Sequence, residues 1–296
     1  HIIMSGEYGG GFVLDGPDDL EKVFLYNYAA DVREKRIHYI IEHRTKYFHF
    51  HADLDIKVQI DMDDESVLKL INDLVYCAKK FYPSTTSISR FDCVVCISRK
   101  KGKTGVHPIF PNLVVDVNQA IDIRNYYVAF LISKYGTEMN GVKNSWEDIV
   151  DMSVYEKNGL RMAYSHKTEN CPDCKGVKKR RKDSFDIPQK APCSFCGGRG
   201  RIDGETVYTP RYYLRNGEIH PEWTKVVQNG YDTKFKDDSG NVRCVVELCS
   251  IRCPNINESS SDFSISDEEM VRMTEMKKKG KVYNPKAPLS PRERIY

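Results

Sequence analysis

Apolar and polar residues alternate over residues 47–56, which predicts a β-strand with one buried face. The apolar set suits a core and comprises Phe48, Phe50, Ala52, Leu54 and Ile56. The set on the opposite face comprises His49, His51, Asp53 and Asp55. Two carboxylates this close repel each other unless a cation relieves them, so Asp53 and Asp55 are candidate ligands for divalent metal ions in phosphoryl or nucleotidyl transfer. An edge strand with a solvated polar face is the alternative.

The wider pattern predicts alternating helices and strands. Apolar residues at helical spacing indicate an amphipathic helix over residues 63–82. Capping and stop signals support further helices over residues 18–46, 116–135 and 145–148. The other predicted strands cover residues 90–99, 106–115, 155–163, 207–214 and 242–251. This order predicts the α+β class with a mixed sheet.

Composition limits the setting of the protein. A chain of 296 residues can bury a sizeable core, and a net charge of +3 means that affinity for nucleic acid must come from local patches. No apolar run is long enough for a transmembrane helix, so we expect no membrane partner. The ten cysteines would suggest disulfides in a small secreted domain, but four of them have metal-ligand spacing, which favours a reducing, intracellular compartment.

Basic residues and a third acid follow the strand with the two aspartates. Lys103 and His107 lie where one predicted strand passes to the next and could hold a triphosphate, although a basic hairpin tip is the alternative. Asp151 follows two apolar residues and is a candidate third carboxylate. In an extended strand Arg161 and Lys167 would face the same side, which suits a phosphate clamp. Two solvated surface cations are the alternative for this pair.

Two Cys-x-x-Cys pairs form a second candidate site, one for a metal ion. Each pair can present two thiolates to one ion, so together they predict a tetrahedral Zn²⁺ site formed by Cys171, Cys174, Cys193 and Cys196. Between the pairs lies a run of five cations, Lys178, Lys179, Arg180, Arg181 and Lys182. No buried element could hold this run, so we expect a loop that contacts the phosphates of nucleic acid. A solvated or targeting segment is the alternative.

The remaining cysteines show no complete set of ligands for a second metal site. Cys93 and Cys96 lie three residues apart in an apolar strand, where they point to opposite faces and cannot chelate one ion. We therefore expect them to pack in the core. The roles of Cys244, Cys249 and Cys253 stay open, since no fourth ligand is evident.

Taken together, these motifs resemble the archaeo-eukaryotic primase superfamily. Residues 103–112 and 151–161, with the two aspartates, are most similar to the primase-polymerase domains of primase-helicases from nucleocytoplasmic large DNA viruses. The resemblance covers residues 47–167, with a weaker similarity at residues 249–252. Many members carry serine where this chain has Gly105, so a side-chain hydroxyl contact to the nucleotide would be lost or replaced by a backbone N–H.

The resemblance also implies roles for individual residues. Asp53, Asp55 and Asp151 would bind catalytic Mg²⁺ or Mn²⁺ ions. The residues that would contact the phosphates of the incoming nucleotide are Lys103, His107, Arg161 and Lys167, and His107 would also belong to the catalytic set.

The implied fold is an archaeo-eukaryotic primase core, with mixed sheets, flanking helices, an active-site cleft between two modules and an inserted zinc ribbon. We expect the catalytic core over residues 1–168 and 204–262, the ribbon over 169–203, and a linker to a missing C-terminal region over 263–296. The implied activity is template-dependent nucleotidyl transfer by a two-metal mechanism, with nucleoside triphosphates as substrates. It would comprise primer synthesis and DNA polymerase activity on a single-stranded DNA template.

The resemblance further implies a helicase domain in the full-length protein. It implies a role in viral DNA replication, in the host cytoplasm or at a viral replication site.

Two other function classes stay open at this point. An Asp-x-Asp strand also serves metal-dependent glycosyltransferases, although these give no reason for the lysine-histidine turn, for Asp151 or for a basic zinc insert. A catalytically silent zinc-ribbon module that binds nucleic acid would explain the cysteines alone. Metal-dependent incorporation of nucleotides would reject both alternatives.

Overall fold

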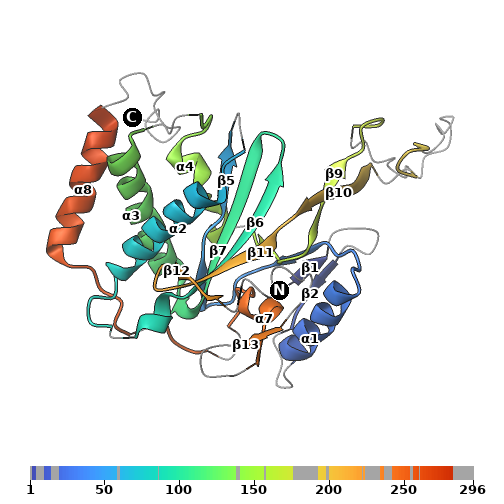
Figure 1. The fold of residues 1–296 in the computed structure, drawn as a ribbon, viewed down its shortest axis with the longest axis horizontal. Helices are drawn as coiled ribbons and strands as arrows, with labels where there is room; N and C mark the ends of the chain where they lie inside the picture. Colours follow the sequence, from blue (N-terminus) through green and yellow to red (C-terminus); the bar gives the residue numbers. More distant parts are fainter. Residues whose placement is uncertain are drawn as a thin grey trace, which may run out of the picture.

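The computed structural model describes the chain over residues 2–4, 10–14, 20–58, 61–85, 87–137, 141–156, 158–175, 193–197, 200–221, 223, 234–236, 242–253, 256–259 and 261–282. A central sheet is flanked by helices on one side and by a smaller sheet on the other, and a two-stranded arm projects from the body (Figure 1). Across these residues no helix has the length and apolar character needed to cross a membrane. The α+β class is confirmed, but the described strand pairs are all antiparallel and not mixed.

The central sheet has six strands in the order β12–β11–β6–β7–β4, with β5 also paired to β7. The strands are β4 (Phe48–His51), β5 (Leu54–Lys57), β6 (Cys93–Lys100), β7 (Lys103–Val115), β11 (Thr209–Arg215) and β12 (Glu218–Ile219). The two middle strands, β6 and β7, are buried over most of their length, and the buried positions include the polar residues Ser98, Thr104 and His107. The sheet therefore forms the centre of the hydrophobic core.

Three long helices pack together beside this sheet, α2 (Asp64–Lys79), α3 (Val117–Tyr135) and α8 (Asp267–Val282), with α3 in contact with the other two (Figure 1). Their ends follow ordinary capping rules. Asp63 accepts a hydrogen bond from the Ser66 N–H, and Asp116 forms a capping box with Gln119. Gly136 ends α3 with a φ of +84°, a conformation that favours glycine. The predicted helices over residues 63–82 and 116–135 are confirmed.

A second sheet lies on the other side of the molecule. It has the order β2–β1–β3–β8, built from β1 (Ile2–Met4), β2 (Gly10–Phe12), β3 (Ile40–Glu42) and β8 (Leu160–Arg161). Helix α1 (Leu20–Arg33) lies beside it and contacts α7 (Val245–Leu248), while β13 (Lys234–Lys236) pairs with β14 (Val242–Cys244) (Figure 1). The short helices are η1 (Ile88–Phe91), α4 (Trp146–Ile149) and α5 (Ser153–Glu156).

A buried glutamate joins the two sheets. Glu42, at the end of β3, accepts hydrogen bonds from the Ser250 hydroxyl at 2.6 Å and the Ile251 N–H at 3.1 Å. The Ile251 carbonyl in turn accepts from the His49 N–H on β4 at 2.9 Å. Burial raises the pKa of Glu42 to about 7, although the two hydrogen bonds oppose part of this rise. The segment after α7 thus connects both sheets through one carboxyl group.

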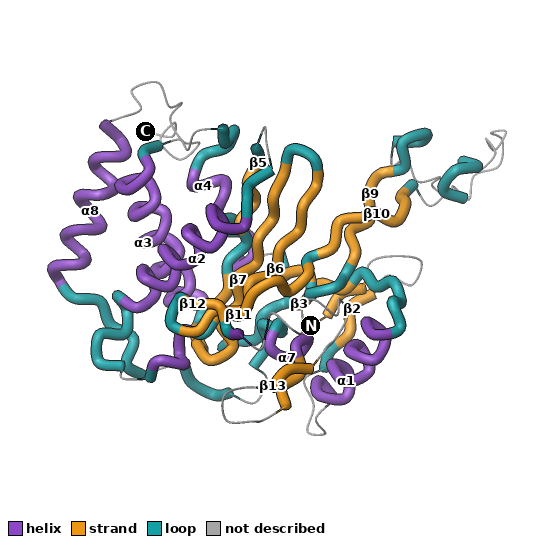
Figure 2. The backbone as a smooth tube through the Cα atoms, in the orientation of Figure 1, coloured by secondary structure: helices purple, strands orange, loops and turns teal. Residues whose placement is uncertain are grey.

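The arm consists of β9 (His166–Asn170) and β10 (Arg201–Val207), which pair with each other and carry the four clustered cysteines at the outer end (Figure 2). Gly204 lies where the register shifts, and a Cβ there would overlap the backbone carbonyl of Lys167. A glycine is therefore needed for the two strands to approach each other at this point.

Several predicted elements differ from the structure. The predicted helix over residues 18–46 is half helix, because the chain turns at Lys35 with a φ of 57° and then forms β3. The predicted strand over 155–163 is reduced to β8, and residues 242–251 form β14 followed by α7. Part of the segment expected as a linker forms α8, whose Glu269 pairs with Lys80 at 2.6 Å.

Candidate active site and metal centre

Asp53 and Asp55 both lie beside β7, the long strand that pairs with β4 and with β5. β7 runs past both β4 and β5, so that Asp55 lies opposite Gly105 in the ladder, while Asp53 lies at the break between the two short strands. At this break the Asp53 carbonyl accepts a hydrogen bond from the Asp151 N–H at 2.9 Å. Residues 53 and 151 are distant in the sequence, yet this contact makes them direct neighbours in the structure.

Each of the two carboxylates faces a cation from β7. The Lys103 Nζ lies 2.7 Å from an Asp55 carboxylate oxygen, and the His107 Nε2 lies 3.3 Å from Asp53 Oδ1. Burial raises the pKa of Asp53, but His107, followed by Lys103 and Arg161, lowers it by more, so the net pKa is below its usual value. Each aspartate therefore has a basic side chain beside it, whereas two unpaired like charges were expected.

One oxygen of this pair has a geometry that suits a metal ligand. Asp53 Oδ1 is buried, and its contact with His107 Nε2 at 3.3 Å does not meet hydrogen-bond geometry, nor does that of any other described residue. A buried carboxylate oxygen without a hydrogen bond is costly unless a cation satisfies it. Carboxylate donors suit the hard cations Mg²⁺ and Mn²⁺, so the residues present fit such an ion.

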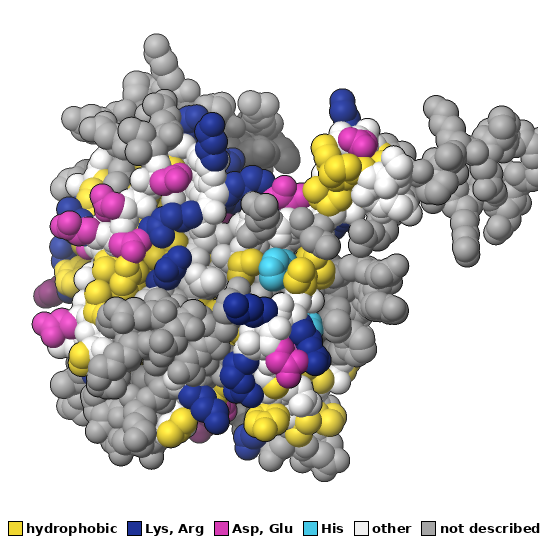
Figure 3. Space-filling model, turned by 45° about the vertical axis from the view of Figure 1, so that its right-hand side comes forward, with side chains coloured by type: hydrophobic (Ala, Val, Ile, Leu, Met, Phe, Trp, Pro, Cys, Tyr) yellow, Lys and Arg dark blue, Asp and Glu magenta, His cyan; other side chains and the backbone are white. Residues whose placement is uncertain are grey.

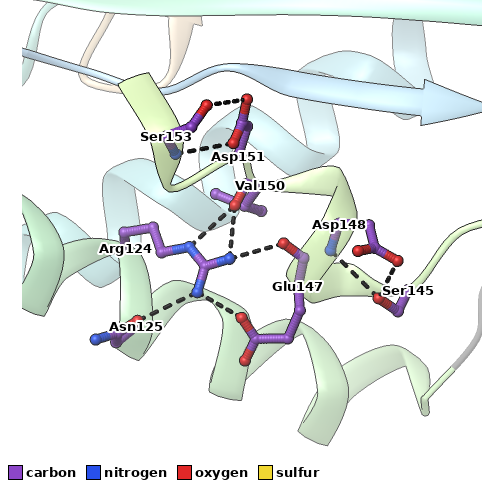
Figure 4. Close-up of polar contacts among 8 residues, drawn as sticks. All are labelled: Arg124, Asn125, Ser145, Glu147, Asp148, Val150, Asp151 and Ser153. Atoms are coloured by element: carbon purple, nitrogen blue, oxygen red, sulfur yellow. Dashed lines mark hydrogen bonds and ion pairs between the residues drawn. The ribbon is translucent and has the colours of Figure 1, made fainter. Parts of the chain in front are cut away.

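Asp151 is held in place by its own neighbours. Its carboxylate accepts hydrogen bonds from the Ser153 N–H and hydroxyl, both at 2.8 Å, at the start of α5 (Figure 4). The three aspartate side chains do not form a compact group, since the only described set of three or more potential ligand atoms within 4.8 Å of one another is the cysteine cluster. Asp151 thus adjoins Asp53 through the backbone, while its carboxylate is directed to Ser153.

A buried arginine that the sequence pattern did not reveal fixes the backbone before Asp151. Arg124, on α3, donates to the Val150 carbonyl from Nε at 3.0 Å and from Nη2 at 2.6 Å, and to the Glu147 carbonyl at 2.8 Å (Figure 4). Its side chain is only 4% exposed and also pairs with the Glu147 carboxylate. A single guanidinium therefore anchors the turn that leads into Asp151.

A basic pocket of about 340 Å³ adjoins the Lys103–Asp55 pair. Its lining comes from β6, β7, β8, the arm and the residue after it, and comprises Ser98, Lys100, Lys101, Lys103, Gly105, Arg161, Lys167, Glu169, Thr206 and Tyr208. A second cavity of about 550 Å³ shares four of these residues and extends along the base of the arm toward Tyr39 and Arg201. Basic side chains also mark the face of the body beside the arm (Figure 3).

Arg161 and Lys167 do line one pocket, but not because they share a strand face. The chain turns between them at Tyr164, which has a φ of 66°, and the Tyr164 N–H donates to the Tyr208 carbonyl at 2.8 Å. Arg161 thus lies on β8 and Lys167 on β9. Burial lowers the pKa of each cation, and for Lys167 the neighbouring cations add to the effect. The two residues therefore line one pocket from separate strands, so the predicted extended strand is wrong, and their role as a phosphate clamp stays a prediction.

Tyr208 is a second residue of the site that the sequence did not indicate. Its ring stacks on the His107 ring with centroids 3.4 Å apart, and the Arg161 guanidinium lies 5.0 Å from its centroid. In the sequence, a tyrosine within the strand predicted over residues 207–214 resembles an ordinary core residue. Only the tertiary structure places it on the same face as Lys103 and His107.

The four paired cysteines converge at the end of the arm. The Cys171 and Cys193 sulfurs lie 3.7 Å apart, and the Cys174 and Cys196 sulfurs 3.6 Å apart. All four sulfurs lie within 4.8 Å of one another, as a tetrahedral Zn²⁺ site requires. Burial raises the pKa of Cys196, but the Gly200 N–H and the other thiols lower it further, to about 7. A thiol that ionises readily is a better metal ligand.

The other cysteines behave as packing residues. Cys93 and Cys96 are buried in β6, as expected, and the Cys96 sulfur lies 3.8 Å from that of Cys249. Burial raises the pKa of Cys249 well above its usual value, which leaves an unreactive thiol. In the parts of the chain described here, these residues form no second group of potential metal ligands. The predicted basic loop, residues 178–182, lies outside the described residues.

The α+β core with several sheets, the acidic strand beside a basic pocket and the four-cysteine cluster fit an archaeo-eukaryotic primase (AEP) domain, the class of primase- and polymerase-type nucleotidyltransferases. A family model described as the C962R protein N-terminal AEP domain, from a large DNA virus, matches residues 1–175, and the chain belongs to this family. The match includes all the predicted catalytic residues and the first cysteine pair. No curated protein matches the chain.

Membership in this family implies nucleotide and nucleic-acid binding in general. It also favours nucleotidyl transfer over the glycosyltransferase alternative and over a catalytically silent module.

Proposed function

We propose that this domain synthesises primers on a single-stranded DNA template, and extends them, by two-metal nucleotidyl transfer. The observation that carries the proposal is the placement of Asp53 and Asp55, each against a basic side chain of β7, next to a pocket lined by basic residues. Such a site can bind metal ions and a triphosphate together, which nucleotidyl transfer needs.

Asp53 and Asp55 would hold Mg²⁺ or Mn²⁺, and these ions would supply Lewis-acid stabilisation of the phosphates when bound. Asp151 would join them after its side chain leaves Ser153, since its backbone is already hydrogen-bonded to Asp53. Lys103 and His107 would then be released from the carboxylates and become free to contact the triphosphate. The same basic residues would thus balance the charge of the aspartates in the metal-free protein and the charge of the phosphates when metal and nucleotide are bound.

The second cavity supports a longer polyanion than a triphosphate. It continues from the basic pocket, shares Lys100, Arg161 and Lys167 with it, and is also lined by Arg201 on the arm. We propose that the DNA strand follows this path toward the cysteine cluster, where the run of cations at 178–182 would contact phosphates. The proposed setting is viral DNA replication within a longer primase-helicase, in the host cytoplasm or at a viral replication site.

The direct test of the proposed function is synthesis on an unprimed single-stranded DNA template. The domain is incubated with labelled ribo- or deoxyribonucleoside triphosphates, with Mg²⁺ or Mn²⁺, and with a chelator as the control. We expect labelled products that need both the template and the metal. If no product forms with either metal and either nucleotide type, the proposed activity is wrong.

The nucleotide pocket yields a prediction for its cations. Arg161→Ala and Lys167→Ala should each raise the KM for nucleoside triphosphate by about 10-fold, because each removes one charged contact to phosphate. His107→Ala should do the same and also lower kcat, since it removes the partner of Asp53. Steady-state kinetics and template affinity measured by fluorescence anisotropy check these expectations.

Arg36→Ala is a matched control for these cations, because Arg36 is 62% exposed and pairs only with surface acids on and beside α1. The assignment to the nucleotide is contradicted if the three pocket variants lose affinity for the template and keep the wild-type KM for nucleotide.

The cysteine cluster yields a prediction for metal content. Cys171→Ser should lower bound zinc from one ion per chain to near zero, because a structural site needs all four thiolates. The central sheet is formed by other segments, so the far-ultraviolet circular dichroism spectrum should change little. Elemental analysis of the purified protein measures the zinc.

Cys244→Ser serves as the control for the cluster, because Cys244 lies outside it at the start of α7 and serine is tolerated at a helix N-cap. Unchanged zinc in Cys171→Ser would show that the cluster is not the zinc site.

A further inference from the structure

The hydroxyl of Tyr208 lies where residue 105 would carry a side chain. A Cβ built on Gly105 would overlap this hydroxyl oxygen and approach the ring carbon that bears it to 2.9 Å. The glycine and the tyrosine are therefore complementary, since any larger residue at 105 would displace the ring. The phenol thus occupies the space above β7 between Lys103 and His107.

This position puts the phenol at the wall of the basic pocket. Tyr208 and Gly105 line the pocket together with Lys103, Arg161 and Lys167. The ring is held on one side by His107 and is close to the Arg161 guanidinium, so the direction of the hydroxyl is restricted. The side chain as a whole is only 4% exposed, so it reaches the pocket at its edge and is otherwise packed in the core.

A backbone donor does not replace this hydroxyl. Gly105 lies in β7 between two paired strands, opposite Asp55 of β5 and Ser98 of β6. Peptide N–H groups of a central strand point along the sheet to the neighbouring strands and not out of its face. The phenol is therefore a neutral hydrogen-bond donor on this face, at the position where the strand itself offers no side chain. Burial raises the pKa of Tyr208, so the group keeps its proton.

We propose that the Tyr208 hydroxyl donates a hydrogen bond to a phosphate oxygen of the bound nucleoside triphosphate. A polyanion is the expected ligand because the side chains around the hydroxyl are mostly cations. The inference rests on the proposed function and adds a neutral donor, supplied from outside the strand, to the triphosphate site. It also explains why residue 105 is a glycine, since a side chain there would overlap the phenol.

The main experiment compares two ligands that share only their phosphates. Binding of a nucleoside triphosphate and of inorganic triphosphate is measured by isothermal titration calorimetry for the wild type and Tyr208→Phe. The phenylalanine keeps the ring that stacks on His107 and removes only the hydroxyl. We expect both ligands to bind about 10-fold more weakly, the loss typical of one hydrogen bond to a charged group.

Tyr212→Phe is the matched control. Its hydroxyl donates to Asp64 on α2, away from the pocket lining, so both affinities should equal those of the wild type. The proposal is overturned if Tyr208→Phe binds inorganic triphosphate as the wild type does. A loss confined to the nucleoside triphosphate would also overturn it, because the hydroxyl would then contact the sugar or the base.

A transfer of the hydroxyl separates contact from packing. Tyr208→Leu removes the phenol, and adding Gly105→Ser to that variant places a hydroxyl on the other side of the former contact. We expect the double variant to recover part of the lost affinity for inorganic triphosphate, whereas Gly105→Ser alone should weaken binding through its clash with Tyr208. Failure of the proposed function is distinguishable, since the wild type itself would then bind neither ligand and form no product.

Discussion

Asp53→Asn and Asp55→Asn are each expected to lower metal-dependent nucleotide incorporation by about 100-fold or more. Each change removes one negative charge from the pair that would bind the ions, and bound metal contributes several kcal/mol to catalysis of this kind. The measurement is the initial rate on a primed template at saturating Mg²⁺ and again at saturating Mn²⁺. Thermal unfolding should remain close to that of the wild type, because asparagine keeps the shape of the side chain.

The control for this pair is Asp267→Asn, which removes an exposed carboxylate from the first turn of α8, outside the lining of either cavity. It should leave the rate unchanged. Wild-type rates in both Asp53→Asn and Asp55→Asn would remove the two aspartates from the catalytic site. A loss of rate with an equal loss of folded protein would indicate a structural role for the ion pairs with His107 and Lys103.

Glu42→Gln is expected to change how stability depends on pH. The pKa of Glu42 is about 7 in the folded protein and near 4.5 in a model peptide, so the folded state binds more protons between these values. The free energy of unfolding contributed by this group therefore falls as pH rises from about 4.5 to about 7, by roughly 3 kcal/mol. Glutamine stays neutral, so the variant lacks this fall. Its single carbonyl oxygen can accept from the Ile251 N–H, while its NH2 group can donate to the Ser250 hydroxyl oxygen.

The test is the difference in unfolding free energy between Glu42→Gln and the wild type, from urea titrations at pH 5 and pH 8. The difference should shift by about 3 kcal/mol in favour of the variant at pH 8. His51, whose pKa burial lowers to about 4, acts in the opposite direction but cancels because both proteins contain it. Glu65→Gln, at an exposed site on α2, should show no such shift. A difference that does not vary with pH would contradict the prediction.

The acidic strand was predictable because its signal is local. Alternation of period two identifies the buried apolar residues around Asp53 and Asp55 without any knowledge of the partners. It does not show that His51, on the predicted polar face, is buried too, or that the chain divides into β4 and β5. The same holds for the helices that begin at Asp63 and Asp116, whose caps lie within four residues of the groups they satisfy. The cysteine pairs are also local, because each Cys-x-x-Cys turn presents both sulfurs together.

The residues that the sequence did not reveal act across long separations. Arg124 resembles a surface cation in a helical pattern, yet it is buried against carbonyls of another segment. Tyr208 contacts His107 only because β11 pairs with β6, and β6 with β7. Arg161 and Lys167 do line one pocket, but a turn with positive φ brings them together, and not a common strand. Periodicity describes one element at a time, so it does not report such contacts.

The arm sets a fixed spacing between two regions of the molecule. Lys167, at the inner end of the arm, lines the basic pocket, and Cys171, four residues further along, belongs to the cysteine cluster. Four steps of extended chain span roughly 13 Å, which equals about four base-pair steps of duplex DNA at 3.4 Å each. A nucleic acid bound at the cluster would thus be held a few nucleotides from the site of phosphate binding. The number of residues in β9 would then set the length of product that first contacts the cysteine cluster.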